Sequence, residues 1–288
     1  MNRELEAIQL AGGPTTPEIV ALMDRTIGDF PIDHETSVAS AWSAMLKASE
    51  SSFTGRMRRI GSAGSRPNSR DSVQDWKDEY EPRSHRGTAG VLRDVLEDRL
   101  DHDGLVVVVE ASASPAVRLS SLVERARSDP DGSIVFLGIS ELDRYAGVMV
   151  VPFRILQSVP PVGFFDLKEQ LLPLCRARGY GLEGEVIARR AIRIHDRESW
   201  LAAIHEWRLL HELDSEPEWC AGSRIEGASV VSNTSQVDGA TIVSSIVMPG
   251  ARLEPGAVVA RSIIAEDAVV SRDRVVTDRI VAVGEVVR

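Results

Sequence analysis

Residues 225–260 read IEGASVVSNTSQVDGATIVSSIVMPGARLEPGAVVA, and an aliphatic side chain returns about every sixth residue. The recurring positions are Ile225, Val231, Val237 and Val243, followed after an offset of four by Val247, Leu253 and Val259. Small residues such as Gly, Ala, Ser and Thr fall three or four places after most of them. This pattern is typical of hexapeptide repeats, in which three short strands complete one triangular coil. We therefore expect the C-terminal quarter to form a short left-handed parallel β-helix of fewer than about three coils.

The composition is that of a globular protein. A length of 288 residues is enough for one large or two ordinary domains, and an apolar share of 43% is enough to build a core. The longest aliphatic run, residues 105–109, is too short to cross a bilayer, and residues 1–6 lack the charge and apolar run of a signal peptide. Cys175 and Cys220 lie on unrelated segments, without the spacing of a zinc site or a disulfide framework. We expect a cytoplasmic protein without a membrane partner.

The formal net charge of −10 argues against a nucleic-acid-binding protein, because such proteins present excess Lys and Arg to phosphates. Residues 55–70 differ locally: they hold five arginines and no acidic residue, among Gly, Ser and Pro. Two interpretations stay open for this stretch. One is an anion-binding loop; the other is a solvated excursion rich in turn-forming residues, which is what most charge runs are.

Strand and helix patterns alternate from residue 5 to about residue 212, which indicates an α/β domain with a Rossmann-like, mixed but mainly parallel sheet. Strands are expected at 6–10, 57–60, 105–109, 133–139, 146–151 and 190–194. Helices are expected at 17–25, 36–48, 117–127 and 165–176, from Gly87 to about Leu100, and after an N-cap at Asp196. The predicted domains are therefore residues 1–212 and 223–288, joined by a linker at 213–222.

Two glycine-rich loops follow strand or precede helix patterns. Gly12 and Gly13 come directly after the first strand, and residues 87–90 (GTAG) open a helix. Without side chains, such loops let backbone N–H groups approach phosphates or a base edge. A tight strand-to-helix turn explains each of them equally well. Two such loops in one sheet favour the ligand-binding interpretation more than one does.

Taken in order, these segments resemble the sugar-1-phosphate nucleotidyltransferases, the family that includes mannose-1-phosphate guanylyltransferase and ADP-glucose pyrophosphorylase. Residues 7–13 (AIQLAGG) resemble its opening strand and nucleotide loop, residues 30–32 the segment after its signature lysine, and residues 86–93 the loop that meets base and sugar. Residues 145–150 resemble a later strand and residues 165–173 the helix beyond it. The resemblance implies a nucleotide or sugar nucleotide as ligand. It implies these nucleotide-binding residues: Leu10, Ala11, Gly12, Gly13, Gly87, Thr88, Ala89 and Gly90.

The family's chemistry joins a nucleoside triphosphate to a sugar phosphate by in-line attack at the α-phosphorus, so positive charge and a divalent metal must offset several negative oxygens. In the family a Gly-x-Gly-Thr-Arg-Leu run supplies an arginine and a Pro-Lys pair supplies a lysine. Here Gly13 is followed by residues 14–18 (PTTPE), and residues 28–31 (GDFP) occupy the lysine segment. Both cations are missing.

The metal-binding aspartates of the family are missing as well. Ala111 stands where the family's central strand ends in aspartate, and Arg193 stands in the segment of the second aspartate. Glu110 and Asp196 are candidates only if the register slips by one residue, and magnesium is required only if the chain is active. His195 beside Asp196 suggests an acid/base pair, but an N-cap with charged neighbours is the simpler interpretation, as it is for Asp166.

Three functions follow from these observations. The first is a degenerate nucleotidyltransferase homologue that acts as a binding, regulatory or assembly subunit, in a homo-oligomer or with an active paralogue. The second is a divergent, active sugar-nucleotide pyrophosphorylase whose missing cations come from residues 56–70. The third, a hexapeptide acyltransferase, is disfavoured because no histidine follows His211.

Overall fold

The computed structural model describes residues 3–10, 19, 26–49, 57–61, 76–213, 218–220 and 222–288. The chain divides into two compact units. The first contains residues 1–13, 42–113 and 117–191, and the second contains residues 14–41, 114–116 and 192–288. The second unit therefore joins the last long helix and an N-terminal segment to the C-terminal repeats. In the described ranges, no helix combines the length and apolarity needed to cross a bilayer.

The first unit is built on a seven-stranded sheet with the order β3-β2-β1-β4-β6-β5-β7. Its strands are β1 (Glu4–Leu10), β2 (Met57–Gly61), β3 (Trp76–Tyr80), β4 (Gly104–Glu110), β5 (Ile134–Ser140), β6 (Tyr145–Pro152) and β7 (Gly181–Ala188). Strand β6 runs antiparallel to both neighbours, while the other pairs are parallel. The expectation of an α/β fold with a parallel-rich sheet is confirmed in this form.

Among the described residues, sequence reasoning predicted one strand that does not form and missed two that do. The strand expected at 190–194 is wrong, because these described residues belong to no strand of the sheet and are held by loop contacts such as Ser114 N–H to Ile192 O, 3.0 Å. The last strand is β7 instead, whose alternation of Gly and Glu hides it from a search for apolar runs. Strand β3 was missed because its sequence, WKDEY, is mostly charged.

The described helices follow the expected positions, apart from the short helix Phe153–Leu156, which was not predicted. They are α2 (Val38–Ser49), α3 (Gly87–Val95), α4 (Ser120–Ser128), α5 (Phe153–Leu156), α6 (Leu172–Ala177) and α7 (Arg197–His211), with a π-helical turn at Leu167–Leu171 and 3-10 turns at Ile27–Asp29, Glu97–Arg99 and Glu218–Cys220. The helix from Gly87 ends at Val95 rather than near Leu100. The expected helix at 17–25 lies outside the described residues except for Ile19.

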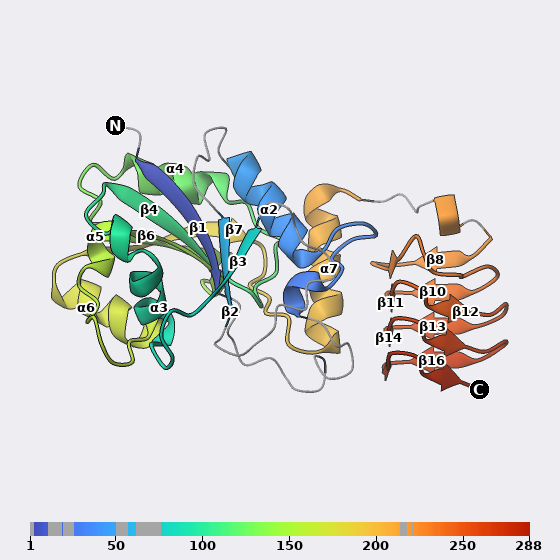
Figure 1. Ribbon diagram of the computed structural model, residues 1–288. Helices are drawn as coiled ribbons and strands as arrows, with labels where there is room; N and C mark the ends of the chain where they lie inside the picture. The colour runs from blue at the N-terminus through green and yellow to red at the C-terminus, as the bar shows by residue number, and fades with distance from the viewer. Residues whose placement is uncertain are drawn as a thin grey trace. The chain divides into compact units, whose positions relative to one another are not determined.

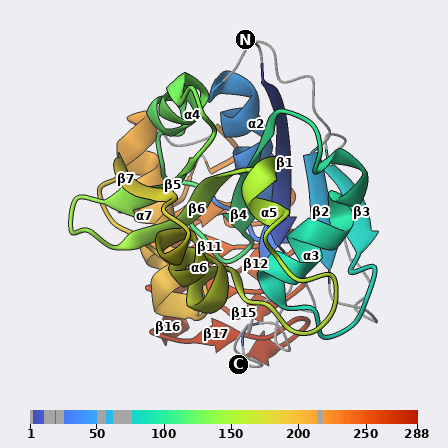
Figure 2. The ribbon, with the colours of Figure 1, turned by 90° about the vertical axis from the view of Figure 1, so that its left-hand side faces the viewer.

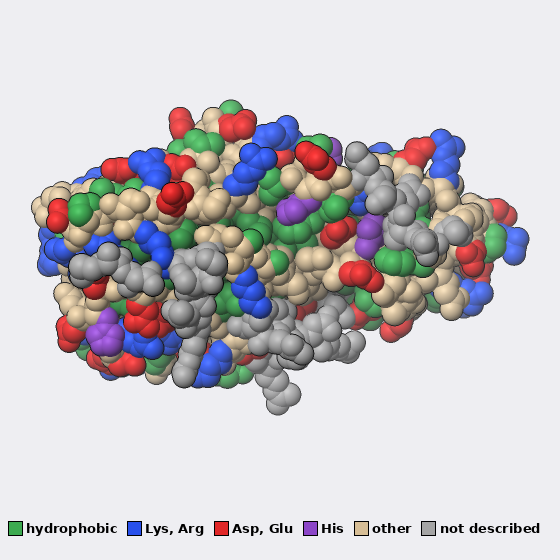
Figure 3. All heavy atoms as spheres, turned by 90° about the horizontal axis from the view of Figure 1, so that it is seen from above, with side chains coloured by type: hydrophobic (Ala, Val, Ile, Leu, Met, Phe, Trp, Pro, Cys, Tyr) green, Lys and Arg blue, Asp and Glu red, His purple; other side chains and the backbone are tan. Residues whose placement is uncertain are grey.

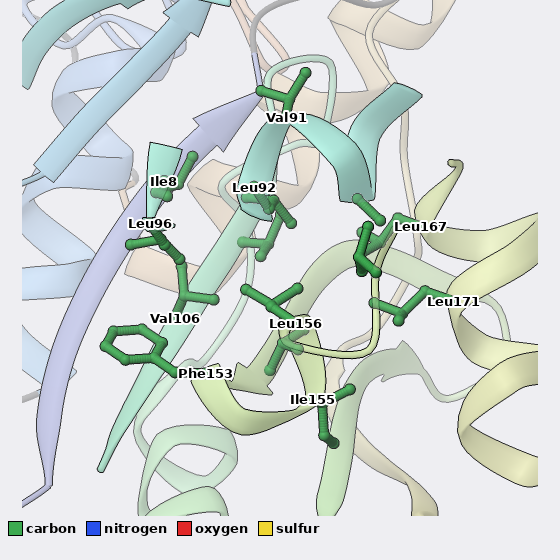
Figure 4. Packing of buried hydrophobic residues seen from close by; sticks show 14 of the residues in the cluster. Ile8, Val91, Leu92, Leu96, Val106, Phe153, Ile155, Leu156, Leu167 and Leu171 are labelled. Atoms are coloured by element: carbon green, nitrogen blue, oxygen red, sulfur yellow. The ribbon is translucent and has the colours of Figure 1, made fainter. Parts of the chain in front are cut away.

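One face of the sheet is covered by α3, α5 and α6, which Figure 2 shows on the same side. Leu92 and Leu96, four residues apart, lie toward Ile8 of β1 and Val106 of β4, as Figure 4 shows, and Val91 belongs to the same buried cluster. All five side chains are at most 3% exposed. Burying an aliphatic side chain of this kind contributes roughly 1.5–3 kcal/mol, so this cluster fixes α3 on the sheet.

Helix α7 begins as predicted. The Asp196 carboxylate accepts a hydrogen bond from Ser199 N–H at 2.8 Å, and Ser199 Oγ accepts one from Asp196 N–H at 3.0 Å, which completes a capping box. Trp200, Ile204 and Trp207 are buried along one side of the helix, also as predicted. The N-cap interpretation of Asp196 is therefore confirmed.

The C-terminal repeats form three ladders of short parallel strands, here called the stack (residues 224–287). Two ladders have four strands, β8-β10-β13-β16 and β9-β11-β14-β17, and the third has β12-β15-β18. The bounds are β8 Arg224–Glu226, β9 Val230–Val231, β10 Thr241–Val243, β11 Ile246–Val247, β12 Arg252–Leu253, β13 Val258–Ala260, β14 Ile263–Ile264, β15 Val269–Val270, β16 Val275–Thr277, β17 Ile280–Val281 and β18 Val286–Val287. The prediction of fewer than about three coils is therefore wrong, because two of the ladders have four strands each.

The register explains why the length was underestimated. Ile225, Ile242, Val259 and Val276 lie opposite one another in successive strands, so one coil takes 17 residues rather than 18. The core position is Ile242, which is completely buried, and the expected core position Val243 is only half-buried. Each coil from Ile242 onward contains one step of five residues, and the 16 residues between the paired Val231 and Val247 contain two. A strict search for steps of six therefore loses the pattern after the first coil.

Ser229, Ser245 and Ser262 are buried and form a ladder across successive coils. Ser229 Oγ accepts a hydrogen bond from Ser245 N–H at 3.2 Å, Ser245 Oγ accepts one from Ser262 N–H at 3.0 Å, and Ser262 Oγ accepts one from Arg279 N–H at 3.3 Å. Ser245 Oγ in turn donates to Val243 O at 2.7 Å. The buried hydroxyls are therefore paired, as their burial requires.

The rest of the second unit caps the first coil. The outer backbone edge of β9 is covered by two side chains: Val231 N–H donates to His34 Nδ1 at 3.0 Å, and Trp219 Nε1 donates to Val231 O at 3.2 Å. Phe30 stacks on Trp200 with ring centroids 4.1 Å apart. The two hydrogen bonds to Val231 protect a strand edge that otherwise invites pairing with another chain.

Helix α7 lies on the side of the stack formed by the ladder β9-β11-β14-β17, as Figure 1 shows for β11 and β14. Arg197 of α7 donates to the Arg261 carbonyl and lies 3.5 Å from the Asp278 carboxylate. The outward-facing Ile246 and Ile263 are completely buried. The second ladder is thus an internal surface of this unit.

Candidate functional site

The candidate site lies where the parallel strands β1 and β4 end. Leu10 closes β1 and Glu110 closes β4, and the two ends are joined by a hydrogen bond from Ala111 N–H to Leu10 O at 3.0 Å. Leu10 is buried. The other residues of the first predicted loop, Ala11, Gly12 and Gly13, lie outside the described residues. The first loop therefore contributes only its last strand residue to the described site.

The second predicted loop begins α3, as expected, but its amides are already engaged. The N–H groups of Ala89 and Gly90 both donate to the Phe165 carbonyl, at 3.0 and 3.1 Å. Gly87 has φ +69°, and a Cβ atom there would lie 2.7 Å from the same carbonyl oxygen. The Phe165 peptide thus occupies the helix N-terminus, where the resemblance places a ligand.

The segment Pro160–Asp166, here called the strap, is held in this place by a buried arginine. Arg86 is 3% exposed and pairs with both carboxylate oxygens of Asp94, at 2.8 and 3.1 Å. Its guanidinium also donates to the carbonyls of Pro160, at 2.9 Å, and Gly163. Phe165 N–H donates back to Arg86 O at 2.8 Å. A paired, buried guanidinium is a rigid support, so the strap is fixed rather than loosely attached.

Thr88 links α3 to the end of the strap. Its hydroxyl donates to Asp166 Oδ2 at 3.0 Å and accepts a hydrogen bond from Leu167 N–H at 2.9 Å. Asp166 Oδ1 accepts from Lys168 N–H and Glu169 N–H, which confirms the predicted N-cap. Burial opposes the charged form of Asp166, but these hydrogen bonds and the nearby Lys168 ammonium outweigh it and lower the pKa of the carboxyl group.

The central contact of the site is an ion pair. Lys168 Nζ lies 2.9 Å from Glu110 Oε1 and 5.4 Å from the centroid of the Tyr145 ring. The Glu110 side chain is 16% exposed and that of Lys168 is 47% exposed, so the carboxylate is sheltered beneath the ammonium. Burial raises the pKa of Tyr145 far above its usual range, which keeps the phenol neutral. The carboxylate at the end of β4 is therefore neutralised by the Lys168 ammonium, and the pair carries no net charge.

Magnesium does not fit the described residues. Glu110 is paired with Lys168, and Asp196 belongs to the other compact unit, where Ser199 Oγ donates to it at 2.6 Å and His195 Nε2 lies 3.3 Å away. Burial opposes ionisation of Asp196, but the Ser199 hydrogen bonds and the neighbouring charges lower its pKa. Across the described part of the chain, His, Cys, Asp and Glu form no group of three or more that could hold a metal ion.

The described arginines of the arginine-rich stretch are committed to the sheet. Arg58 donates to Glu6 at 2.5 Å and to Val95 O at 3.0 Å, and Arg59 pairs with both oxygens of Asp78, at 2.6 and 3.1 Å. Of residues 55–70, only 57–61 are among the described residues. These two cations are therefore structural, which sequence reasoning missed because their partners come from β1 and β3.

Charge is mixed on the molecular surface in the view of Figure 3, where Lys and Arg side chains alternate with Asp and Glu. A face that binds a polyanion presents a positive field, and the mixed signs in this view differ from that. The net charge of −10 argues against polyanion binding as well.

Sequence reasoning found Glu110 and Asp166 but missed Lys168 and Tyr145. Lys168 stands two places after a helix N-cap and Tyr145 at a strand start, so neither position carries a motif of its own. A possible signal was the spacing of Asp166 and Lys168 at the start of a helix that the family resemblance already placed near the site.

Neither the family models nor the curated proteins that were searched give a match to this chain. The family resemblance therefore rests only on the resembling segments and on the order in which they occur along the sequence.

Proposed function

We propose that this chain is a degenerate sugar-1-phosphate nucleotidyltransferase homologue that acts as a binding, regulatory or assembly subunit rather than as a catalyst. In this proposal the first unit is a Rossmann-like domain and the stack is a left-handed parallel β-helix. The order of the resembling segments along the sequence and the 17-residue coils support this assignment. Its proposed setting is the cytoplasm.

The Glu110–Lys168 ion pair is the observation that supports the loss of catalysis. Attack at an α-phosphorus gathers several negative oxygens, and a divalent metal held by carboxylates normally offsets their repulsion. Here the one carboxylate at the end of β4 is neutralised by an ammonium at 2.9 Å, and Ala111 offers no oxygen beside it. A single charge that is already paired supplies little of the required field.

The proposed partners follow from what the scaffold retains. A nucleotide or sugar nucleotide is the proposed ligand, bound without magnesium, and the proposed assembly is a homo-oligomer or a hetero-oligomer with an active paralogue. The ion pairs of Arg58 and Arg59 argue against the alternative of a divergent, active pyrophosphorylase, because carboxylates already neutralise these two cations.

A ligand-stability panel tests this proposal. The melting temperature of the full chain is measured with nucleoside triphosphates, sugar phosphates and sugar nucleotides, each with and without magnesium. We expect a nucleotide or sugar nucleotide to raise the melting temperature by the same amount in both conditions, since binding to the native state alone stabilises it. Stabilisation that requires magnesium supports the active pyrophosphorylase instead. No shift with any ligand contradicts the binding role.

A further inference from the structure

The two edge strands of the seven-stranded sheet differ in how they are protected. Strand β3 forms one margin and β7 the other, as Figure 2 shows. Three of the five residues of β3, Lys77, Asp78 and Glu79, are charged, and its length is short. Strand β7 has eight residues, GLEGEVIA, with neither Pro nor Lys. Charge and shortness are the usual defences of an edge against pairing. Strand β7 is longer than β3, and its only charged residues are two glutamates that share Arg125, so its edge is less protected.

The open part of β7 runs from residue 182 to residue 186. Gly181 N–H donates to Ser133 O at 2.9 Å, so alternation turns the backbone groups of residues 182, 184 and 186 away from β5. The open part ends at Ile187 and Ala188, whose carbonyls accept from Arg118 N–H and Glu141 N–H. Gly184 is exposed and Val186 is 54% exposed. This edge is accessible over five residues.

The two faces of this edge have different chemistry. One carries the carboxylates of Glu183 and Glu185, which share one guanidinium: Arg125 lies 2.5 Å from Glu183 and 2.6 Å from Glu185. The three groups sum to one negative charge. The other face carries Leu182, Gly184 and Val186, which are uncharged. An added strand would meet an acidic row on one side and an apolar row on the other.

We propose that residues 182–186 of β7 bind an extended segment of a partner protein in which basic and apolar residues alternate, as an added strand of the sheet. The alternation matches the two faces, and the basic side chains complement the excess carboxylate. A second copy of this chain fits less well, because antiparallel pairing about Gly184 sets Glu183 opposite Glu185 of the second copy, and like charges directly opposite are destabilising. This surface goes beyond the proposed function and does not depend on it.

The test uses the full chain and a short synthetic peptide in which lysine and valine alternate, with the same peptide carrying glutamate for lysine as its control. Hydrogen exchange is followed at the amides of residues 182, 184 and 186. We expect the lysine peptide to slow exchange at these amides and the glutamate peptide to leave them unchanged. Binding should weaken with added salt, because exposed charge pairs are screened.

Variants separate the two faces. Glu185→Gln should weaken binding of the lysine peptide about fivefold at low salt, and Val186→Lys by about as much, since each removes one cross-strand pair. Val162→Lys, at a position 73% exposed outside β7, is the matched control and should bind like the wild type. Equal binding of both peptides, or unchanged exchange at millimolar lysine peptide, overturns the proposal. So does a dimer of the free chain that protects these amides and is lost in Val186→Lys, because it assigns the edge to a second copy.

Discussion

Replacing Gly87 by alanine tests whether the strap closes the start of α3. Gly87 has φ +69°, and its added Cβ would lie 2.7 Å from Phe165 O and 2.8 Å from Phe165 C. Gly163, within the strap, has φ +88° and no atom within 4 Å of its added Cβ. Gly163→Ala therefore imposes the same kind of backbone cost without the clash.

The expected magnitudes follow from this difference. The left-handed backbone costs an alanine about 1–2 kcal/mol, which both variants lose. In Gly87→Ala the Phe165 peptide must also move, at an overpacking cost of about 1–3 kcal/mol. The movement weakens the hydrogen bonds from Ala89 and Gly90, each worth about 1 kcal/mol. We expect Gly87→Ala to lose about 2–4 kcal/mol more stability than Gly163→Ala.

The assay is denaturant unfolding of both variants, followed by native-state hydrogen exchange at the amides of Ala89 and Gly90. Exchange at these amides should be faster in Gly87→Ala and unchanged in Gly163→Ala, because only the first variant displaces their acceptor. Equal losses of stability together with unchanged exchange would refute the claim that the Phe165 carbonyl caps α3.

Three further predictions concern the stack and the strap. Ser245→Ala leaves a buried amide of the next coil without its acceptor and should cost about 1–3 kcal/mol in thermal unfolding, against less than about 0.5 for the half-buried Ser271→Ala. Ile242→Ala should cost about 2–5 kcal/mol and Val243→Ala distinctly less, because only the first residue is completely buried; the reverse order contradicts the 17-residue register. The pKa of Asp166 is lower in the folded state, so the Asp166 carboxylate stabilises the fold above its unfolded pKa near 4, and this stabilisation is lost as the pH falls through the folded pKa. The difference in unfolding free energy between wild type and Asp166→Asn should therefore disappear in acid. A difference that stays constant down to about pH 2 counts against the cap.

The sequence predicted the features that repeat or that carry local chemistry. The parallel strand β4 was predicted from an unbroken aliphatic run, and the caps at Asp166 and Asp196 were predicted from residue type and position alone. Both signals are local, so they survive without knowledge of the tertiary structure. The six-residue pattern predicted the class of the stack for the same reason.

Features that depend on distant partners were missed. The five-residue step at Ile242 is set by pairing with Ile225 and Val259, so the periodicity alone placed the core position one residue late. Strand β7 is an edge strand whose two glutamates share the guanidinium of Arg125, which lies elsewhere in the sequence. Such pairings are properties of the folded sheet rather than of any one segment.

The site shows the same division. Glu110 was a candidate because it ends a buried strand, but its partner Lys168 comes from a helix start 58 positions later. The amides of residues 89 and 90 were expected to meet a ligand, and the Phe165 carbonyl that accepts from them is invisible in their own motif. Local chemistry identified the place, and the long-range contacts decide what it can bind.

Measuring the release of pyrophosphate tests most directly the central claim that Lys168, and not a metal ion, neutralises the Glu110 carboxylate. The full chain is incubated with magnesium, a nucleoside triphosphate and a sugar 1-phosphate, beside the variant that combines Glu110→Gln and Asp196→Asn. We predict that the wild type releases no more pyrophosphate than this variant. Magnesium-dependent release by the wild type that falls in the variant would contradict the account, because it would show that these carboxylates still support the reaction.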